Sequence, residues 1–243
     1  MFPQPSPSRQ EELTQAYNNV LQEVTKTSSR PVRLVAVTKL KPSSDIMALY
    51  NIGVRHFGEN YVQELITKSQ ELPKDIQWHF IGGLQTGKCK DLAKSIDNLY
   101  AVEAVDSLKK CKKLDSVRHS LEGAQIQIYL QVNTSGEEQK SGYSVSDLSD
   151  IEETVGYLTS LECKTLKLQG LMTIGSFSES TADVEENQDF AKLVELKNKL
   201  DEKFSLDLEL SMGMSNDYIQ AIKQGSTNVR VGSLILGARP PRT

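Results

Sequence analysis

The sequence predicts a single α/β domain, a (β/α)8 TIM barrel of parallel strands with an extra N-terminal helix. Its 243 residues suffice for one large α/β domain. Short apolar segments alternate with helical segments along the chain, and eight such units in about 210 residues fit a closed barrel better than an open doubly wound sheet. No low-complexity linker or repeat divides the chain. We therefore expect a flexible tail at 1–8 and a barrel domain over 9–243.

The first elements follow from proline positions and apolar spacing. Residues 1–8 carry three prolines among small polar residues, which is typical of a loose tail. From residue 9 to about residue 26 apolar side chains recur at helical spacing, which predicts the extra helix. Leu34–Val37 is a short apolar run and predicts the first strand, and the proline and capping residues of 42–45 open the next helix.

The remaining strands and helices follow the same alternation. Strands are expected at 54–57, 76–81, 98–102, 126–132, 168–174, 208–212 and 228–231. Helical segments are expected near 60–70, 85–96, 106–120, 146–160, 181–203 and 215–224. Strict alternation of this kind predicts a parallel sheet whose strands are covered on both faces.

Charge and cysteine content exclude several classes of protein. The formal net charge is -4 at pH 7, whereas nucleic-acid-binding domains usually carry a basic excess, so we expect no nucleic-acid partner. The three cysteines are far apart, which argues against a disulfide framework or a metal site and favours reduced thiols. The first residues lack a signal or transit pattern, and no apolar run approaches the roughly 18 residues that cross a membrane. We therefore expect a cytoplasmic protein without a membrane partner.

Lys39 is the strongest single candidate for chemistry. In a (β/α)8 barrel the side chains at the C-terminal ends of the strands share one mouth, where active sites lie. Lys39 directly follows the first apolar strand. A lysine there is partly desolvated, which favours the neutral amine that Schiff-base formation requires. The alternative is a lysine that extends from the strand end into solvent.

A second pattern predicts an anion site. Gly232 and Ser233 begin a short helical turn after the eighth strand, where backbone N–H groups often bind phosphate. Ser211 and Ser215, at the end of the seventh strand, could add hydroxyl donors, and Arg230 lies on the eighth strand. Alternatively, Gly232 only allows the chain to turn and the serines cap the helix near 215–224.

Two further features have a structural explanation beside a functional one. His79, in the third strand, either binds a ligand or is a satisfied strand residue. Met172, Met212 and Met214 are more typical of core filling than of a cofactor site.

The segment from Gly82 to Lys88 matches the GxxxxGK pattern of a phosphate-binding P-loop. The next residue should be Ser or Thr to bind magnesium. It is Cys89, whose thiol is a poor ligand for that hard cation. We interpret the match as accidental and keep nucleotide binding as a weaker alternative.

Six segments carry a family resemblance that spans about residue 30 to Arg239. They are Val35–Lys39, Phe57–Glu64, Trp78–Gly82, Gly170–Met172, Ser211–Ser215 and Gly225–Gly232. Together they resemble the pyridoxal phosphate homeostasis proteins, also called proline synthetase co-transcribed homologues. The resemblance implies a barrel similar to the N-terminal domain of alanine racemase, with pyridoxal 5'-phosphate (PLP) held as a Schiff base on Lys39.

The resemblance also implies roles for other residues. Arg230 faces the pyridine nitrogen of the cofactor, and backbone N–H groups of Gly232 and Ser233 bind its phosphate. Ser211 and Thr227 assist at the phosphate. Further cofactor contacts are implied for Asn60, His79, Met212 and Ser215.

The family is linked to balanced pools of free PLP and amino acids, which implies a carrier or regulator with PLP-dependent apoenzymes as candidate recipients. An arginine at the ring nitrogen does not readily give up a proton, so the ring stays neutral and is a weaker electron sink. Racemases of this fold take a second base from a β-domain after the barrel, whereas this sequence stops at Thr243. We therefore expect a monomer with little or no turnover. The alternative is a PLP-dependent, racemase-like enzyme.

Overall fold

The chain folds into a closed barrel of eight parallel strands, which confirms the predicted fold class. The structure is a computed structural model that describes residues 1–240. Consecutive strands are neighbours, and β1 also pairs with β8, with Val35 opposite Arg230, which closes the barrel. The strands are β1 (Arg33–Val37), β2 (His56–Glu59), β3 (Gln77–Phe80), β4 (Leu99–Val105), β5 (Ile126–Gln131), β6 (Leu166–Met172), β7 (Glu209–Ser211) and β8 (Asn228–Val231).

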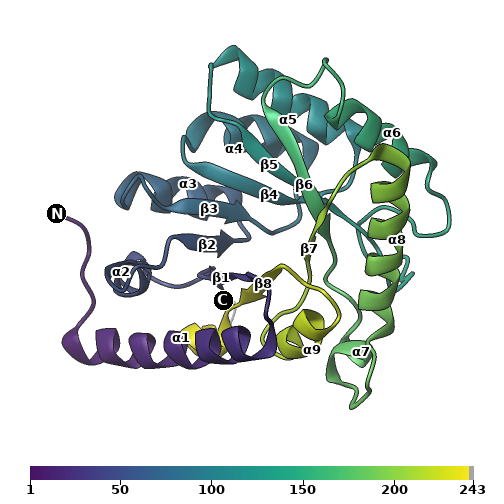
Figure 1. Cartoon of the computed structure of the whole chain (residues 1–243). Helices are drawn as coiled ribbons and strands as arrows, with labels where there is room; N and C mark the ends of the chain where they lie inside the picture. Colours follow the sequence, from purple (N-terminus) through teal and green to yellow (C-terminus); the bar gives the residue numbers. More distant parts are fainter. Residues whose placement is uncertain (241–243) are drawn as a thin grey trace.

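Helices connect the strands and lie on the outside of the barrel (Figure 1). Their apolar faces and the outward side chains of the strands form one large hydrophobic core. The helices are α1 (Pro7–Thr27), α2 (Ser43–Asn51), α3 (Val62–Glu71), the 3-10 turn η1 (Thr86–Lys88), α4 (Cys89–Ser95), α5 (Leu108–Ser120), α6 (Ser149–Leu158), α7 (Phe177–Thr181), α8 (Gln188–Phe204), α9 (Tyr218–Lys223) and α10 (Ser233–Leu236).

The predicted extra helix is α1, which runs along the outside of the barrel beside α9 (Figure 1). It begins at Pro7 rather than at Arg9, because Ser6 Oγ accepts the Arg9 N–H at 3.2 Å and a proline suits the first helical turn. Its buried residues are Leu13, Val20 and Val24. The helix packs against α2, α9 and α10 and so covers the barrel where α10 is only one short turn.

The helix predicted over 181–203 begins later in the structure. α7 ends at Thr181, and α8 begins only at Gln188. The Asn187 side chain accepts the N–H of Phe190 at 3.0 Å and caps the start of α8. This cap sets the start of the helix, which the apolar spacing alone placed too early.

Strand side chains alternate between the barrel interior and the surrounding helices. On β1, Leu34 and Ala36 belong to the outer core, whereas Arg33 contacts interior side chains of other strands and Val37 lines the mouth. The next inward position after Val37 is Lys39. The alternation therefore directs this lysine into the barrel mouth.

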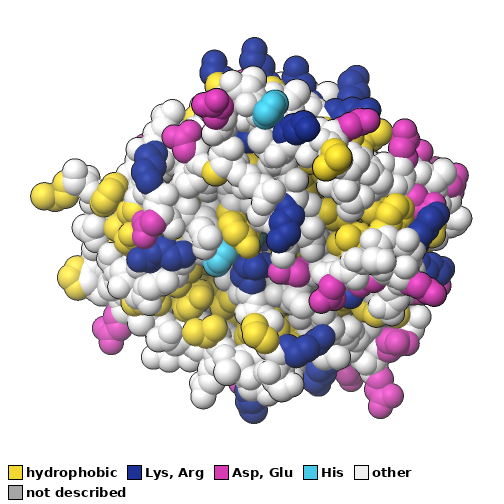
Figure 2. All heavy atoms as spheres, turned by 45° about the horizontal axis from the view of Figure 1, so that its top comes forward, with side chains coloured by type: hydrophobic (Ala, Val, Ile, Leu, Met, Phe, Trp, Pro, Cys, Tyr) yellow, Lys and Arg dark blue, Asp and Glu magenta, His cyan; other side chains and the backbone are white. Residues whose placement is uncertain are grey.

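The outer surface carries charges of both signs. Figure 2 shows basic and acidic side chains interspersed over the face that it presents. Within residues 1–240, no helix combines the length and the apolar character needed to cross a membrane. Cys89, Cys111 and Cys163 are free thiols, and the first two are buried.

Candidate functional site

A cavity of about 320 Å³ lies at the C-terminal ends of β1, β2 and β8. This volume is at the lower end of the range typical of small-molecule sites, roughly 300–1,000 Å³. The expected binding residues that line it are Lys39, Asn60, Ser215, Arg230, Gly232 and Ser233. Lining residues that were not predicted as binding residues are Val37, Ile81, Ile174, Met214, Asn216 and Arg239. Met214 was expected in the core, but its side chain is 39% exposed and borders the cavity.

A buried ion cluster holds the backbone on both sides of the strand-end lysine. Lys68 Nζ, on α3, donates to the carbonyl of Thr38 at 2.8 Å, to Glu59 Oε1 at 2.7 Å and to Glu64 Oε1 at 2.6 Å. Thr38 Oγ1 also donates to Glu59 Oε1 at 2.7 Å, and the Leu40 N–H donates to Glu64 Oε1 at 2.7 Å. The cluster stabilises Leu40 in a left-handed conformation with φ 61°, which non-glycine residues rarely adopt. The ion cluster thus fixes the backbone turn around Lys39 through contacts to the residues before and after it.

Arg230 lies at the floor of the cavity and is 3% exposed. Its Nη1 donates to Ser211 Oγ at 2.5 Å, and its Nη2 donates to the carbonyl of Thr173 at 2.9 Å. Burial lowers the pKa of Arg230 from its usual value, and Glu103 opposes this effect. Because arginine stays protonated in proteins, the floor presents a fixed hydrogen-bond donor and a positive charge.

The opposite part of the cavity contains the first turn of α10. Gly232 and Ser233, at the start of α10, line the cavity, and Ser215, from the loop after β7, lies beside this turn. The Leu234 N–H reaches Ser215 Oγ at 3.5 Å. Backbone N–H groups at a helix start, together with these hydroxyls, suit a phosphate group.

Asn60 is held at the cavity wall by close packing. A Cβ atom on Gly82 would lie 2.0 Å from the carbonyl oxygen of Asn60, so only glycine allows the loop after β3 to approach this closely. Asn60 Oδ1 is buried without a hydrogen-bond partner among the described residues. A buried acceptor of this kind favours a bound ligand that carries a donor.

The structure places four expected cofactor contacts away from this cavity. On β7, Ser211 points inward but lies below the cavity, where it supports Arg230, and the next residue, Met212, points outward into the core. Thr227 precedes β8 and therefore lies at the N-terminal end of the barrel, where its hydroxyl accepts the Leu210 N–H at 3.0 Å. His79, on β3, is fully buried inside the barrel. The next inward position toward the mouth is Ile81, and its side chain lines the cavity in place of His79.

The GxxxxGK segment does not assemble a phosphate loop. Thr86–Lys88 forms a 3-10 turn that continues into α4, and the Lys88 side chain is 56% exposed and pairs with Asp91 at 3.9 Å. The Cys89 side chain is buried and donates to the Gln85 carbonyl. The glycine at the start of the segment serves the close approach to Asn60. The segment therefore gives no support to the nucleotide-binding alternative.

Comparisons with known proteins agree with the fold. The profile of the alanine racemase N-terminal domain family matches residues 12–240. The pyridoxal phosphate homeostasis protein of Schizosaccharomyces pombe is 47% identical over 213 residues, which cover 88% of this chain and 86% of that protein. The human protein of the same name is 41% identical, over 85% of this chain and 76% of the human protein.

Solved structures show the same relation. PipY of Synechococcus elongatus, solved with PLP bound, is 30% identical and superimposes with a TM-score of 0.76 over 93% of this chain and 100% of its own. Alanine racemase of Clostridium difficile, with a TM-score of 0.73 and 15% identity over 95% of this chain and 60% of its own, shares the fold. The chain belongs to the pyridoxal phosphate homeostasis protein family, whose barrel is that of the alanine racemase N-terminal domain.

Proposed function

We propose that this protein binds PLP as a Schiff base on Lys39 and acts in PLP homeostasis as a carrier or regulator, with little or no catalytic turnover. The observation that carries the proposal is the convergence of Lys39, Arg230 and the start of α10 on one cavity. An amine, a cation and a phosphate-binding turn match the aldehyde, the ring nitrogen and the phosphate of PLP. Relatives named for PLP homeostasis, at 47% and 41% identity, support the proposal.

The six expected binding residues that line the cavity each have a part in this binding. Lys39 Nζ bonds to the aldehyde carbon with loss of water. Arg230 donates to the ring nitrogen, and the Asn60 side chain lies at the edge of the ring. Gly232, Ser233 and Ser215 bind the phosphate. When bound, PLP supplies an electron-withdrawing ring, and the arginine keeps that ring neutral.

The proposal is tested by the visible absorption spectrum of the purified protein before and after borohydride treatment. We expect an absorption band of protein-bound PLP that borohydride converts into a permanent reduced adduct. A protein that shows no such band after incubation with PLP would contradict the proposal.

The turn at α10 predicts a strong preference for the phosphorylated cofactor. Charge-assisted hydrogen bonds contribute about 1.5–3 kcal/mol each, so two of them should make PLP bind about 10²-fold or more tightly than pyridoxal. Equilibrium titration of the apoprotein with both ligands measures this ratio. Ser215→Ala should reduce the ratio several-fold. Equal affinities of the wild type for PLP and pyridoxal would show that the turn binds no phosphate.

The position of His79 predicts slow chemistry on amino acids. A racemase needs a second base, and His79, which was expected at the cofactor, lies inside the barrel, hydrogen-bonded to Glu103 and His56. With PLP bound, we expect slow, stereoselective exchange of the α-proton of alanine and no racemisation. Deuterium exchange on L- and D-alanine, with chiral analysis of the product, measures both. Turnover on the order of 1 to 10³ per second would make the protein an enzyme.

We further propose that the protein acts as a monomer in the cytoplasm, with PLP-dependent apoenzymes as recipients. Free, largely buried thiols suit a reducing compartment. Transfer is measurable by mixing the loaded protein with an apoenzyme and following activity. Transfer slower than the spontaneous release of PLP would contradict the carrier role.

A further inference from the structure

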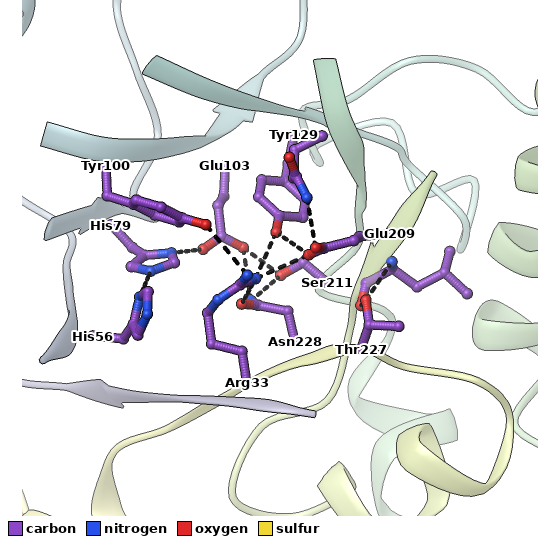
Figure 3. Close-up of polar contacts among 12 residues, drawn as sticks. Arg33, His56, His79, Tyr100, Glu103, Tyr129, Glu209, Ser211, Thr227 and Asn228 are labelled. Atoms are coloured by element: carbon purple, nitrogen blue, oxygen red, sulfur yellow. Dashed lines mark hydrogen bonds and ion pairs between the residues drawn. The ribbon is translucent and has the colours of Figure 1, made fainter. Parts of the chain in front are cut away.

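The interior of this barrel is unusually polar. In most (β/α)8 barrels the interior is filled by layers dominated by Val, Ile and Leu. Here a hydrogen-bonded network of polar side chains passes through the barrel interior (Figure 3). The members that connect to the cavity floor are His56, His79, Glu103, Ser211, Asn228 and Arg230. Burying such groups is costly, and proteins often deviate from an apolar core to support a functional site.

The network connects a carboxylate to the cavity floor through one hydroxyl. Arg230 Nη1 donates to Ser211 Oγ at 2.5 Å, and that hydroxyl donates in turn to Glu103 Oε1. Asn228 Nδ2 donates to Ser211 Oγ at 3.0 Å and to Glu103 Oε1 at 3.2 Å. Every member of this group is buried. The serine hydroxyl thus has its hydrogen directed at Glu103 and its lone pairs directed at Arg230 and Asn228.

The second oxygen of Glu103 is held from the other side. His79 Nδ1 lies 2.7 Å from Glu103 Oε2, and His79 Nε2 lies 2.8 Å from His56 Nδ1. Burial alone would raise the pKa of Glu103, but the contacts of its carboxylate with His79, Arg230 and Ser211 together outweigh burial and lower the pKa. Burial also lowers the pKa of His56 to about 3, so that ring stays neutral. Glu103 is therefore an oriented carboxylate with both oxygens bound.

We infer that Glu103 is a positioning residue, which holds the buried Arg230 guanidinium in place beneath the ring nitrogen of the cofactor. The inference rests on the proposed PLP site. Glu103 supplies the negative charge that balances the desolvated arginine, and Ser211 transmits its orientation. Without that charge, Arg230 loses its electrostatic partner, and its hydrogen bond to the ring nitrogen weakens.

The test compares PLP with its carbocyclic analogue, in which C–H replaces the ring nitrogen. A charge-assisted hydrogen bond to that nitrogen should give the wild type a preference for PLP of about tenfold or more. Glu103→Gln keeps the size of the side chain and removes its charge. We expect this variant to lose roughly fivefold or more of that preference, since residues in one network typically couple by such amounts.

Glu209→Gln is the matched control. Glu209 is another interior carboxylate, but its partners are Arg33, Tyr129 and Gln169 at the N-terminal end of the barrel (Figure 3). The Glu209→Gln variant should lower the free energy of unfolding and leave the preference for PLP over the carbocyclic analogue unchanged. An equal loss of preference in both variants would reduce Glu103 to a general structural role and overturn the inference.

Ser211→Ala provides a second route if Glu103→Gln folds poorly. It interrupts the connection, so it should lower the same preference, and Glu103→Gln added to it should lower the preference little further. Wild-type preference in either single variant contradicts the inference. Failure of the proposed function is distinguishable, because the wild-type protein would then form no borohydride-stable adduct with PLP at all.

Discussion

Replacement of Lys39 by alanine should abolish the covalent PLP adduct completely and leave the barrel folded. The Lys39 amine is the group that bonds to the aldehyde of PLP, and alanine has no side-chain nitrogen to replace it. The side chain is only half-buried at the strand end and contributes little to packing. We therefore expect the free energy of unfolding of the apoprotein to change by only about 0.5 kcal/mol. Borohydride reduction followed by intact-mass measurement reports the adduct, and thermal unfolding of the apoprotein reports the fold.

Lys140→Ala is the control for this loss. Lys140 lines an adjoining cavity of about 240 Å³, and its Nζ donates to the Gly175 carbonyl at 2.7 Å. This variant should keep the adduct. An adduct that persists in Lys39→Ala, or that disappears in Lys140→Ala alone, would contradict the assignment of Lys39.

Lys68→Met should cause the largest loss of stability, about 3–5 kcal/mol at pH 8. Lys68 is the common donor of the ion cluster behind the strand-end lysine, and its side chain is 7% exposed. Its removal leaves Glu59 as a buried carboxylate without its cation. Chemical denaturation of the apoprotein measures the loss.

The same variant has a predicted pH dependence. Burial raises the pKa of Glu59 from 4.5 to about 7, although Lys68 and Thr38 act to lower it. The folded state therefore holds this proton more tightly than the unfolded state, and the contribution of Glu59 to the free energy of unfolding falls as the pH rises from about 4.5 through about 7. Without Lys68 the pKa rises further, so the destabilisation should be larger at pH 8 than at pH 5.

Lys199→Met is the control for the ion cluster. Lys199 pairs with Glu195 at 2.7 Å at the same helical spacing, but both side chains are exposed. Lys199→Met should lower the free energy of unfolding by only about 0.3–0.5 kcal/mol. A similar cost for both variants, or a cost for Lys68→Met that is equal at pH 5 and pH 8, would contradict the account of the cluster.

The sequence allowed the barrel and several residues that line the cavity to be predicted, because both follow from local patterns. The alternation of strands and helices predicts a parallel barrel, and strand ends predict its mouth. Lys39, Arg230 and Gly232 were identified in this way. The alternation of side chains along a strand would also have predicted that Met212 and Thr227 do not point into the barrel interior. Each is out of phase with an inward neighbour, Ser211 or Asn228.

Other parts of the site depend on contacts between distant segments. Glu103 reaches Ser211 from β4 to β7, and this pairing follows only from the closed geometry of the barrel. The cluster of Lys68 with Glu59 joins a helix to a strand end in the same way. Isolated acids and lysines of this kind have no distinguishing sequence pattern, because most of them lie on solvated surfaces.

The central claim is a covalent bond between Lys39 and PLP, and peptide mapping of the borohydride-reduced wild-type protein tests it most directly. The protein is incubated with PLP, reduced, digested and sequenced by tandem mass spectrometry. The account predicts a reduced pyridoxyl phosphate group on the peptide that contains Lys39, in about one equivalent per chain. A group found on Lys88 or Lys140, or spread over surface lysines in proportion to their exposure, would contradict it.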